Sequence, residues 1–226
     1  MFGTTFFADN SYGIGGIDSY TKLMLHLDNN VVDSEITPKT VTNNGVTFSN
    51  VISKFSYSGV FDGSTSYLTV TNSSDFNFDA NFTVDLWLNM EDNSVNMEPI
   101  CNGDLSSGDN GWGIYYESIG PTLKFFVKDA GGFNYVQNTQ SFTNGSWYHI
   151  AAVRSSSIIT LYVNGSSIGT LNYGTGTISS SNNLFISKRP SVSIGYVKGN
   201  MDEVRISKGI ARWTANFTPP AAPYIT

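Results

Sequence analysis

Hydrophobic and polar residues alternate most clearly in residues 147–165, which read WYHIAAVRSSSIITLYVNG. Two strand-like runs flank three serines, and Asn164-Gly165 closes the second run. Because successive side chains of a strand point to opposite faces, the pattern predicts a β-hairpin with one face in a core. The Asn-Gly pair favours the positive φ angles of a tight turn. The expected core face comprises Trp147, His149, Ala151 and Val153 on the first strand and Ile159, Leu161 and Val163 on the second.

The same period of two predicts strands along the rest of the chain. The strongest run is residues 81–90 (NFTVDLWLNM), in which Phe82, Val84, Leu86 and Leu88 share one face. Residues 60–70 surround Asp62-Gly63 and are predicted to form a hairpin. Other strands are expected at residues 23–28, 112–116, 122–127, 133–136, 184–187 and 201–206. With roughly twelve to fourteen strands and no helix beyond a turn near residues 208–213, the chain is predicted to be all-β, with two antiparallel sheets packed face to face.

The chain has 226 residues and shows no fixed repeat and no linker, so one large core is expected. We predict a sandwich domain over residues 18–220, an N-terminal arm at residues 1–17 and an extended tail at residues 221–226. The net charge of −6 argues against a nucleic-acid partner, because phosphate binding needs a basic patch. No apolar run reaches the ~20 residues of a membrane span, and the first residues lack the features of a signal peptide. We therefore expect no membrane insertion.

The reactive side chains form no recognisable catalytic or metal-binding pattern. Cys101 is the single cysteine and is expected to be a buried thiol, not a nucleophile. His149 falls on the expected core face and is interpreted as a buried, hydrogen-bonded histidine. His26 lies opposite the leucines of the first strand, and neither histidine has metal-site spacing to Cys101.

Six segments in a fixed order resemble a known family: SYLTV, NFTVDLWLNM, WYHIAAVR, LYVNG, GNMDEVRISKGIARW and NFTPP. They are similar to the laminin-G-like, concanavalin A-like lectin/glucanase superfamily, in the pentraxin-like branch often found in phage structural proteins. The resemblance runs from about Leu23 to Pro220. It implies a jelly-roll sandwich, often used to bind carbohydrate and sometimes holding a structural calcium. Phage members with the ending GIARW and NFTPP occur in tail fibres, adhesins or capsid decorations, so the resemblance also implies a location on a virion surface.

The glucanase relatives carry an E-x-D-x-x-E strand, in which alternation places carboxylates on one face as nucleophile and general acid. This sequence has no such run. Asp202 and Glu203 are adjacent, so a regular strand would point them to opposite faces, and Asp85 and Glu91 are too far apart in register. We therefore predict a binding protein and not an enzyme, with a polysaccharide hydrolase as the least favoured alternative.

The resemblance places a calcium ion of some relatives near the first and last strands, where Asp28 and Asp202 lie in this chain. Calcium needs several carboxylate, amide and carbonyl oxygens, and neighbouring asparagines could add to these two carboxylates. In the alternative interpretation Asp202 accepts hydrogen bonds from backbone groups or from Arg205. Structural Ca²⁺ is therefore the one cofactor expected, and the alternative stays open at this point.

Aromatic residues near Asn-, Asp- and Gly-rich segments suggest where a sugar would bind. Aromatic faces stack on the C–H surface of a pyranose, while polar neighbours bond its hydroxyls. The alternative for these residues is contact with another subunit. The candidates for carbohydrate binding are Trp112, Tyr115, Tyr116, Phe133 and Tyr135.

The N-terminal arm carries aromatic residues that would be costly to expose, so we expect them to pack on this domain or to make assembly contacts. The leading hypothesis is a virion surface or tail-appendage protein that presents a glycan-binding face to the host. The runner-up is a capsid decoration or tail protein that uses the sandwich for contacts with other virion proteins. Either setting suggests a homo-oligomer. The candidate assembly residues are Phe2, Phe6, Phe7 and Tyr12.

Overall fold

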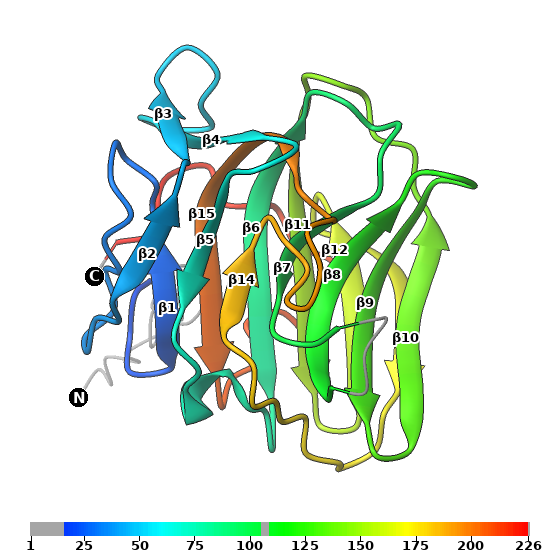
Figure 1. The fold of residues 1–226 in the computed structure, drawn as a ribbon. Helices are drawn as coiled ribbons and strands as arrows, with labels where there is room; N and C mark the ends of the chain where they lie inside the picture. The colour runs from blue at the N-terminus through cyan, green and yellow to red at the C-terminus, as the bar shows by residue number, and fades with distance from the viewer. Residues whose placement is uncertain (1–15, 105–108, 226) are drawn as a thin grey trace, which may run out of the picture.

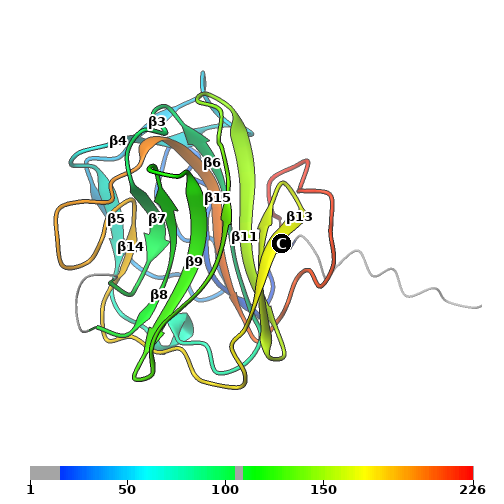
Figure 2. The same cartoon turned by 90° about the vertical axis from the view of Figure 1, so that its right-hand side faces the viewer.

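The computed structural model describes residues 16–104 and 109–225 of the chain (Figure 1). Over these ranges it contains fifteen strands in two antiparallel sheets and one short 3₁₀-helix, η2 (Ser74–Phe76). Figure 2 shows the two sheets facing each other across the core. The predicted all-β sandwich is confirmed. The candidate assembly residues Phe2, Phe6, Phe7 and Tyr12 lie outside the described residues.

The two sheets contain eight and seven strands within the described ranges. The eight-stranded sheet has the order β13 (Ser166–Asn172), β12 (Ile158–Val163), β11 (Trp147–Ser155), β6 (Phe82–Met90), β15 (Lys198–Lys208), β4 (Ser58–Asp62) and β3 (Thr47–Ser49), with β1 (Thr21–Leu25) paired to β15. The seven-stranded sheet has the order β10 (Gly132–Thr139), β9 (Thr122–Asp129), β8 (Gly111–Glu117), β7 (Met97–Cys101), β14 (Leu184–Ile186), β5 (Tyr67–Val70) and β2 (Val41–Asn44).

The main core lies between the sheets and follows from alternation on their inner faces. Strand β6 contributes the four residues expected from its pattern, and β8 and β9 contribute the residues that face them. Phe82 stacks on Phe78 with ring centroids 4.2 Å apart, and Phe125 packs on Phe82 at 5.6 Å. Burying one such side chain contributes about 1.5–3 kcal/mol to stability. This shared core holds the two sheets, and therefore their outer faces, in a fixed relation.

The predicted hairpin is present as β11 and β12, but the first strand faces the other way. Asn164 and Gly165 have φ angles of 49° and 77°, as a tight Asn-Gly turn requires. Ile159, Leu161 and Val163 lie in the main core as expected, and their partners there are Ile150 and Ala152. The expectation for the first strand is wrong, because the apolar residues Ala151 and Val153 are buried on the outer face, in one cluster with Trp213 and with Tyr162 of the neighbouring strand. Both faces of β11 are covered by other residues. Its alternation of side chains therefore does not indicate which face points into the main core.

Residues 60–70 do not form the predicted hairpin. Strand β4 pairs with β3 and β15 in one sheet, whereas β5 pairs with β2 and β14 in the other. Between them Asp62 Oδ1 accepts hydrogen bonds from the backbone N–H groups of Ser64, Thr65 and Ser66, at 2.8–2.9 Å. Gly63 has a φ of 78°. This Asx-type turn directs the chain across the core into the second sheet, an outcome that a local turn signal does not distinguish from a hairpin.

The C-terminal segment covers the outer face of the eight-stranded sheet. Trp213 and Phe217 stack with centroids 4.0 Å apart, and Phe217 also packs on Tyr162. Tyr224, in the predicted tail, is buried and donates a 2.5 Å hydrogen bond from its hydroxyl to Asp85 Oδ2. The backbone of Ile17 also donates to Ile225 O at 2.9 Å, so the two ends of the described chain meet here.

Candidate functional site

The structure separates the five aromatic candidates into two groups. Trp112 and Tyr116 point inward from β8 and lie in the main core. Trp112 Nε1 donates to Phe76 O at 2.8 Å, and Tyr116 Oη donates to Asn93 O at 3.2 Å. Fully buried side chains cannot touch a ligand on the surface, so the expectation was wrong for these two. The alternation within β8 is the physical reason, because residues 112, 114 and 116 share the inner face.

The other three candidates lie together on the outer face of the seven-stranded sheet. Tyr115 projects from β8, and Phe133 and Tyr135 project from β10, with β9 between these strands. Tyr115 is opposite Lys124 of β9. The five side chains that line the hollow enclose about 150 Å³, and they are Tyr115, Lys124, Phe126, Phe133 and Tyr135. We call this the aromatic hollow.

Exposure divides the aromatic hollow into a floor and a rim. Phe133 and Tyr135 are 43% and 49% exposed, whereas Tyr115 and Phe126 are buried. Phe126 packs down on the sheet because Gly113 of β8 lies directly opposite it. A Cβ atom at Gly113 would lie 2.6 Å from the Phe126 ring and 2.6 Å from Cys101 Cβ. The missing side chain of Gly113 is therefore what makes this part of the face concave.

A row of opposed residues continues from the aromatic hollow across the sheet. Tyr135 is opposite Phe126, Phe126 opposite Gly113, Gly113 opposite Cys101, and Cys101 opposite Phe185 of β14. Phe126, Cys101 and Tyr115 form one apolar cluster against which Phe185 packs. Sequence reasoning missed Phe126 and Phe185, although the alternation of TLKFFV in β9 already places Lys124 and Phe126 on one face.

Four cationic side chains lie close to the aromatic rings of this face. Lys124 Nζ is 5.8 Å from the ring centroids of both Tyr115 and Tyr135, and Lys128 Nζ is 4.8 Å from that of Phe133. Lys188 Nζ is 4.9 Å from the Phe185 centroid, and Arg189 Cζ is 5.8 Å from that of Tyr115. These distances fall within the range of cation–π attraction. Cationic groups therefore lie beside the aromatic rings of this face.

Arg189 is held in place by a buried carboxylate. Its Nε and Nη2 atoms each lie 2.7 Å from Oε1 of Glu98, a fully buried residue of β7. Burial raises the pKa of the Glu98 carboxyl above its ordinary value, while the Arg189 guanidinium opposes that shift. Cys101 Sγ donates to Lys188 O at 3.2 Å, and burial raises the pKa of this thiol well above its ordinary value. Cys101 is thus a structural thiol without the lowered pKa of a nucleophile.

Two polar hollows adjoin this face next to Phe185. One has a volume of about 430 Å³ and is lined by Asp109, Asn110, Ser179, Ser180 and Ser181. The second, of about 310 Å³, shares Asp109 and Ser181 with it and includes Phe185 in its wall. Hydroxyl, amide and carboxylate groups therefore lie beside an aromatic ring, which is the combination that sugar hydroxyls and C–H faces can use.

Asp28 and Asp202, the two carboxylates expected at a calcium site, both accept hydrogen bonds from the backbone. Asp28 Oδ1 accepts from the backbone N–H of Tyr57 at 2.8 Å, and Asp202 Oδ2 accepts from those of Lys54 and Phe55 at 3.2 Å. Burial and the neighbouring Glu203 carboxylate raise the pKa of Asp202 to about 8. Across residues 16–104 and 109–225, no group of three or more His, Cys, Asp or Glu side chains could hold a metal ion. The two carboxylates instead fasten residues 54–57 to the sheet.

A β-bulge changes the expected directions of Asp202 and Glu203. The register of β15 against β6 shifts between Asp202 and Arg205, and Glu203 has a φ of 50°. Val204 faces the core, while the side chains of Asp202 and Glu203 are both bonded on the outer face. The argument that adjacent carboxylates point to opposite faces is therefore wrong at this position, because a bulge places two residues opposite one.

Both carboxylates at the bulge are nevertheless buried and engaged. Glu203 Oε1 lies 2.6 Å from His26 Nδ1, and Glu203 Oε2 accepts from the backbone N–H of Tyr224 at 2.8 Å. Asp85 forms a two-point ion pair with Arg205, at 3.0 and 3.3 Å, and its Oδ2 is 3.4 Å from His149 Nε2. These contacts tie strands and tail together. Asp85, Asp202 and Glu203 line none of the three hollows described above.

Two packed antiparallel sheets with an open aromatic face define the chain as a lectin-like β-sandwich. The Laminin_G_3 family model, described as the concanavalin A-like lectin/glucanases superfamily, matches residues 62–212. This is more than half of the chain, and the chain belongs to that superfamily. No curated protein matches the sequence. Among the described residues, no helix is long and apolar enough to cross a membrane.

Several solved structures share the fold at low sequence identity. The binding domain of Paraclostridial Mosquitocidal Protein 1 has a TM-score of 0.64 and 15% identity, over 85% of this chain and 50% of that chain. The botulinum neurotoxin serotype D binding domain has a TM-score of 0.66 and 14% identity, over 85% and 49%. The binding domain of botulinum neurotoxin DC in complex with SialylT has a TM-score of 0.63 and 16% identity, over 87% and 50%. This chain thus spans about half the length of each of these domains.

Proposed function

We propose that the chain is a non-catalytic carbohydrate-binding module whose ligand lies in the aromatic hollow. The observation that carries this proposal is the pair of half-exposed rings, Phe133 and Tyr135, over a concave floor of Tyr115 and Phe126. Such rings offer flat apolar surfaces to the C–H face of a pyranose, and Lys124 offers donors to its hydroxyl or acidic groups. The adjoining polar hollows extend the same face with Ser and Asn side chains.

Membership of a lectin/glucanase superfamily supports carbohydrate as the ligand class. The similar solved structures are binding domains of toxins, and one of them is a complex with SialylT. A likeness over half of those domains supports the fold of a binding module, and the ligand site itself is argued from the side chains of this chain. The burial of Asp85, Asp202 and Glu203 supports binding without hydrolysis, because a glycosidase needs two carboxylates facing its substrate.

We further propose that the module acts on the surface or tail appendage of a virus particle, where it would recognise host glycans. The support is the resemblance of the ending GIARW and NFTPP to phage structural proteins. This setting predicts a homo-oligomer, since virion proteins are commonly symmetric. Size-exclusion chromatography with light scattering would test it, and a strictly monomeric protein at all concentrations would count against this part of the proposal.

The glycan proposal is tested by binding of the purified chain to a broad glycan array, followed by calorimetry on the best ligand. Tyr135→Ala and Phe133→Ala should each weaken binding by about tenfold, as expected when a stacking ring is removed. Tyr20→Ala is the matched control, because Tyr20 is 45% exposed and lies outside the hollow. Trp112→Ala is unsuitable, since Trp112 belongs to the core.

The same rings could instead contact a neighbouring subunit, as a structural tile would require. The half-exposed apolar side chains Phe133 and Tyr135 favour this second candidate as well. The two functions differ in one outcome. If Tyr135→Ala dissociates an oligomer and no glycan binds to the folded wild-type chain, the tile is the function.

A further inference from the structure

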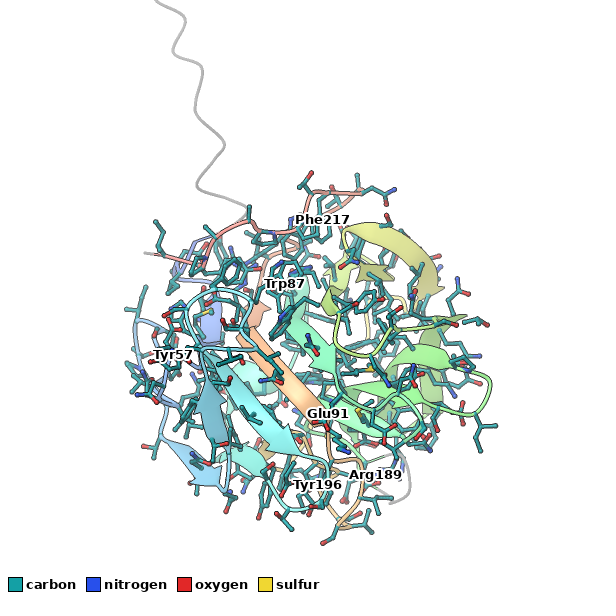
Figure 3. The ribbon with its side chains drawn as sticks, turned by 90° about the horizontal axis from the view of Figure 1, so that it is seen from above. Tyr57, Trp87, Glu91, Arg189, Tyr196 and Phe217 are labelled. Atoms are coloured by element: carbon teal, nitrogen blue, oxygen red, sulfur yellow. The ribbon has the colours of Figure 1, made fainter. Side chains whose placement is uncertain are left out.

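Four of the twelve cationic residues of this acidic chain lie on the face that holds the aromatic hollow. The chain has 12 Lys and Arg residues against 18 Asp and Glu, with a net charge of −6. Four cationic side chains, Lys124, Lys128, Lys188 and Arg189, nevertheless lie within 6 Å of ring centroids on this one face. Figure 3 shows Arg189 on the side of the molecule opposite Trp87 and Phe217. A ligand of the hollow would therefore meet ammonium and guanidinium groups, of which Lys124 is paired with Glu117 and Arg189 with Glu98.

Lys124 occupies the middle of the aromatic hollow. It lies opposite Tyr115 on one side and Gln137 on the other, and its Nζ is equidistant from the Tyr115 and Tyr135 rings at 5.8 Å. Lys128 projects from the same face of β9 four residues later, about 13 Å along the strand. Phe126 lies between the two lysines. Any sugar stacked on Tyr135 or Phe133 would thus be flanked by ammonium groups.

An acidic partner already shows what Lys124 can bind. Its Nζ is 2.7 Å from Oε2 of Glu117, whose side chain is 38% exposed at the end of β8. Water screens an ion pair at such a position, so the pair holds Lys124 only weakly. An incoming carboxylate or sulfate that is also held by ring stacking can replace the Glu117 carboxylate. Glu117 would then act as a competitor of the ligand.

We infer that the aromatic hollow takes an acidic saccharide, that is, a sugar carrying a carboxylate or sulfate group that binds at Lys124. The inference rests on the proposed glycan-binding function and specifies its ligand class. Ring stacking supplies a contact that all pyranoses can make, whereas the ammonium group discriminates between charged and neutral sugars. Single-stranded nucleic acid also combines stacking with negative charge, but its many phosphates would face a chain with a net charge of −6.

The test is a glycan array containing neutral, carboxylated and sulfated members, followed by calorimetry on matched pairs such as 3′-sialyllactose and lactose, and galacturonate oligomers and their methyl esters. Wild-type chain should bind the charged member of a pair about tenfold more tightly. Lys124→Gln should abolish that preference and change neutral binding less than about twofold. Lys22→Gln, on the other sheet, is the charge-matched control.

Glu117→Gln gives a readout that a merely structural role of this ion pair would not produce. Removing the competing carboxylate should tighten binding of the acidic member by about threefold to tenfold and leave the neutral member unchanged. Circular dichroism and thermal unfolding establish that each variant is folded. A structural role would instead lower the unfolding temperature and weaken both members alike, which would overturn the inference.

The remaining outcomes separate this inference from the function on which it rests. Equal binding of charged and neutral members, unaffected by Lys124→Gln, overturns the acidic preference and leaves glycan binding standing. Absence of binding to every saccharide on the array overturns both. Tighter binding of a dT oligonucleotide than of any saccharide would overturn the inference in favour of a nucleic-acid ligand.

Discussion

The polar and aromatic residues on the outer faces of the two sheets differ in how far they are buried. On the eight-stranded sheet, the C-terminal segment and residues 51–57 cover Trp87, His149 and the Asp85–Arg205 pair, and all of these are buried. On the seven-stranded sheet, Phe133 and Tyr135 remain half exposed and cations lie beside the rings. Both outer faces are rich in aromatic residues. Only that of the eight-stranded sheet is covered by other segments, and that of the seven-stranded sheet stays open. The first face therefore contributes buried contacts to stability, and the second is the face on which we propose that the ligand binds.

The largest expected effect on stability comes from breaking the buried ion pair between Asp85 and Arg205. Arg205→Ala should lower the free energy of unfolding by about 3–5 kcal/mol, because it leaves the Asp85 carboxylate buried without its main partner. Urea denaturation measures the change. Lys198→Ala is the control, since Lys198 and Glu91 form an exposed pair with a 3.5 Å separation, and its loss should cost less than about 1 kcal/mol. An equal loss of unfolding free energy in the two variants would contradict the view that buried contacts on the covered face stabilise the fold.

Asp202 gives the covered face a pH dependence. Burial and the Glu203 carboxylate raise its pKa in the folded chain to about 8, above the ordinary value of 3.8. Between these values the folded chain binds one proton more than the unfolded chain, so the free energy of unfolding falls as pH rises from about 4 to about 8 and is level above that. A single group that titrates in this window changes the free energy of unfolding by up to about 1.4 kcal/mol per pH unit.

Asp202→Asn isolates this effect. The amide keeps an oxygen that can accept from the Lys54 and Phe55 N–H groups but cannot ionise. The variant should therefore be more stable than wild type at pH 8 and should have a flatter profile from pH 4 to pH 8. Denaturation curves at several pH values provide the comparison. Parallel profiles for the two proteins would show that another group, such as His26 with its raised pKa, causes the slope.

A substitution at Gly113 should change the shape of the aromatic hollow from below. In Gly113→Ala the new methyl group would fall 2.6 Å from Phe126 ring atoms, so the ring must move up into the hollow. We expect a cost of about 1–3 kcal/mol in stability and a marked loss of glycan binding. Gly176→Ala is a control with a milder contact, 3.3 Å to Tyr173. Undiminished binding in a folded Gly113→Ala protein would place the ligand elsewhere.

Removing the rim of the hollow should hardly affect stability. Tyr135→Ala should change the free energy of unfolding by less than about 0.5 kcal/mol, because the ring is half exposed. Trp87→Ala, on the covered face, should cost about 3–5 kcal/mol. Thermal or urea denaturation of the two variants compares an open with a covered aromatic residue directly. A large loss for Tyr135→Ala would identify it as a packing residue.

Adding or removing calcium is expected to have the smallest effect on stability. Because Asp28 and Asp202 already accept backbone hydrogen bonds, neither excess Ca²⁺ nor a chelator should shift Tm. Differential scanning calorimetry with and without calcium measures this, and magnesium serves as the control cation. A calcium-dependent rise in Tm that disappears in Asp202→Asn would restore the metal site implied by the family resemblance.

Part of the candidate site was accessible from the sequence. Tyr115, Phe133 and Tyr135 were chosen from it, and they lie together in the aromatic hollow. The alternation of WGIYYE would also have separated Tyr115 from Trp112 and Tyr116, and that of TLKFFV would have added Lys124 and Phe126. No local signal marks Gly113 as the floor, since its role depends on Phe126 of the adjacent strand and Cys101 of another.

By itself, the sequence determined the all-β class, the strands with one apolar face, and the superfamily. These depend on nearest-neighbour alternation and on turn residues such as Asn164-Gly165, which act locally. Only the tertiary structure decided which face of β11 is inside, that residues 60–70 cross between sheets, and that a bulge turns Asp202 and Glu203 to one face. The physical reason is the same in each case. Burial depends on what covers a face, and the covering segments, such as the one around Phe217 and Tyr224, lie far along the chain from the strands they protect.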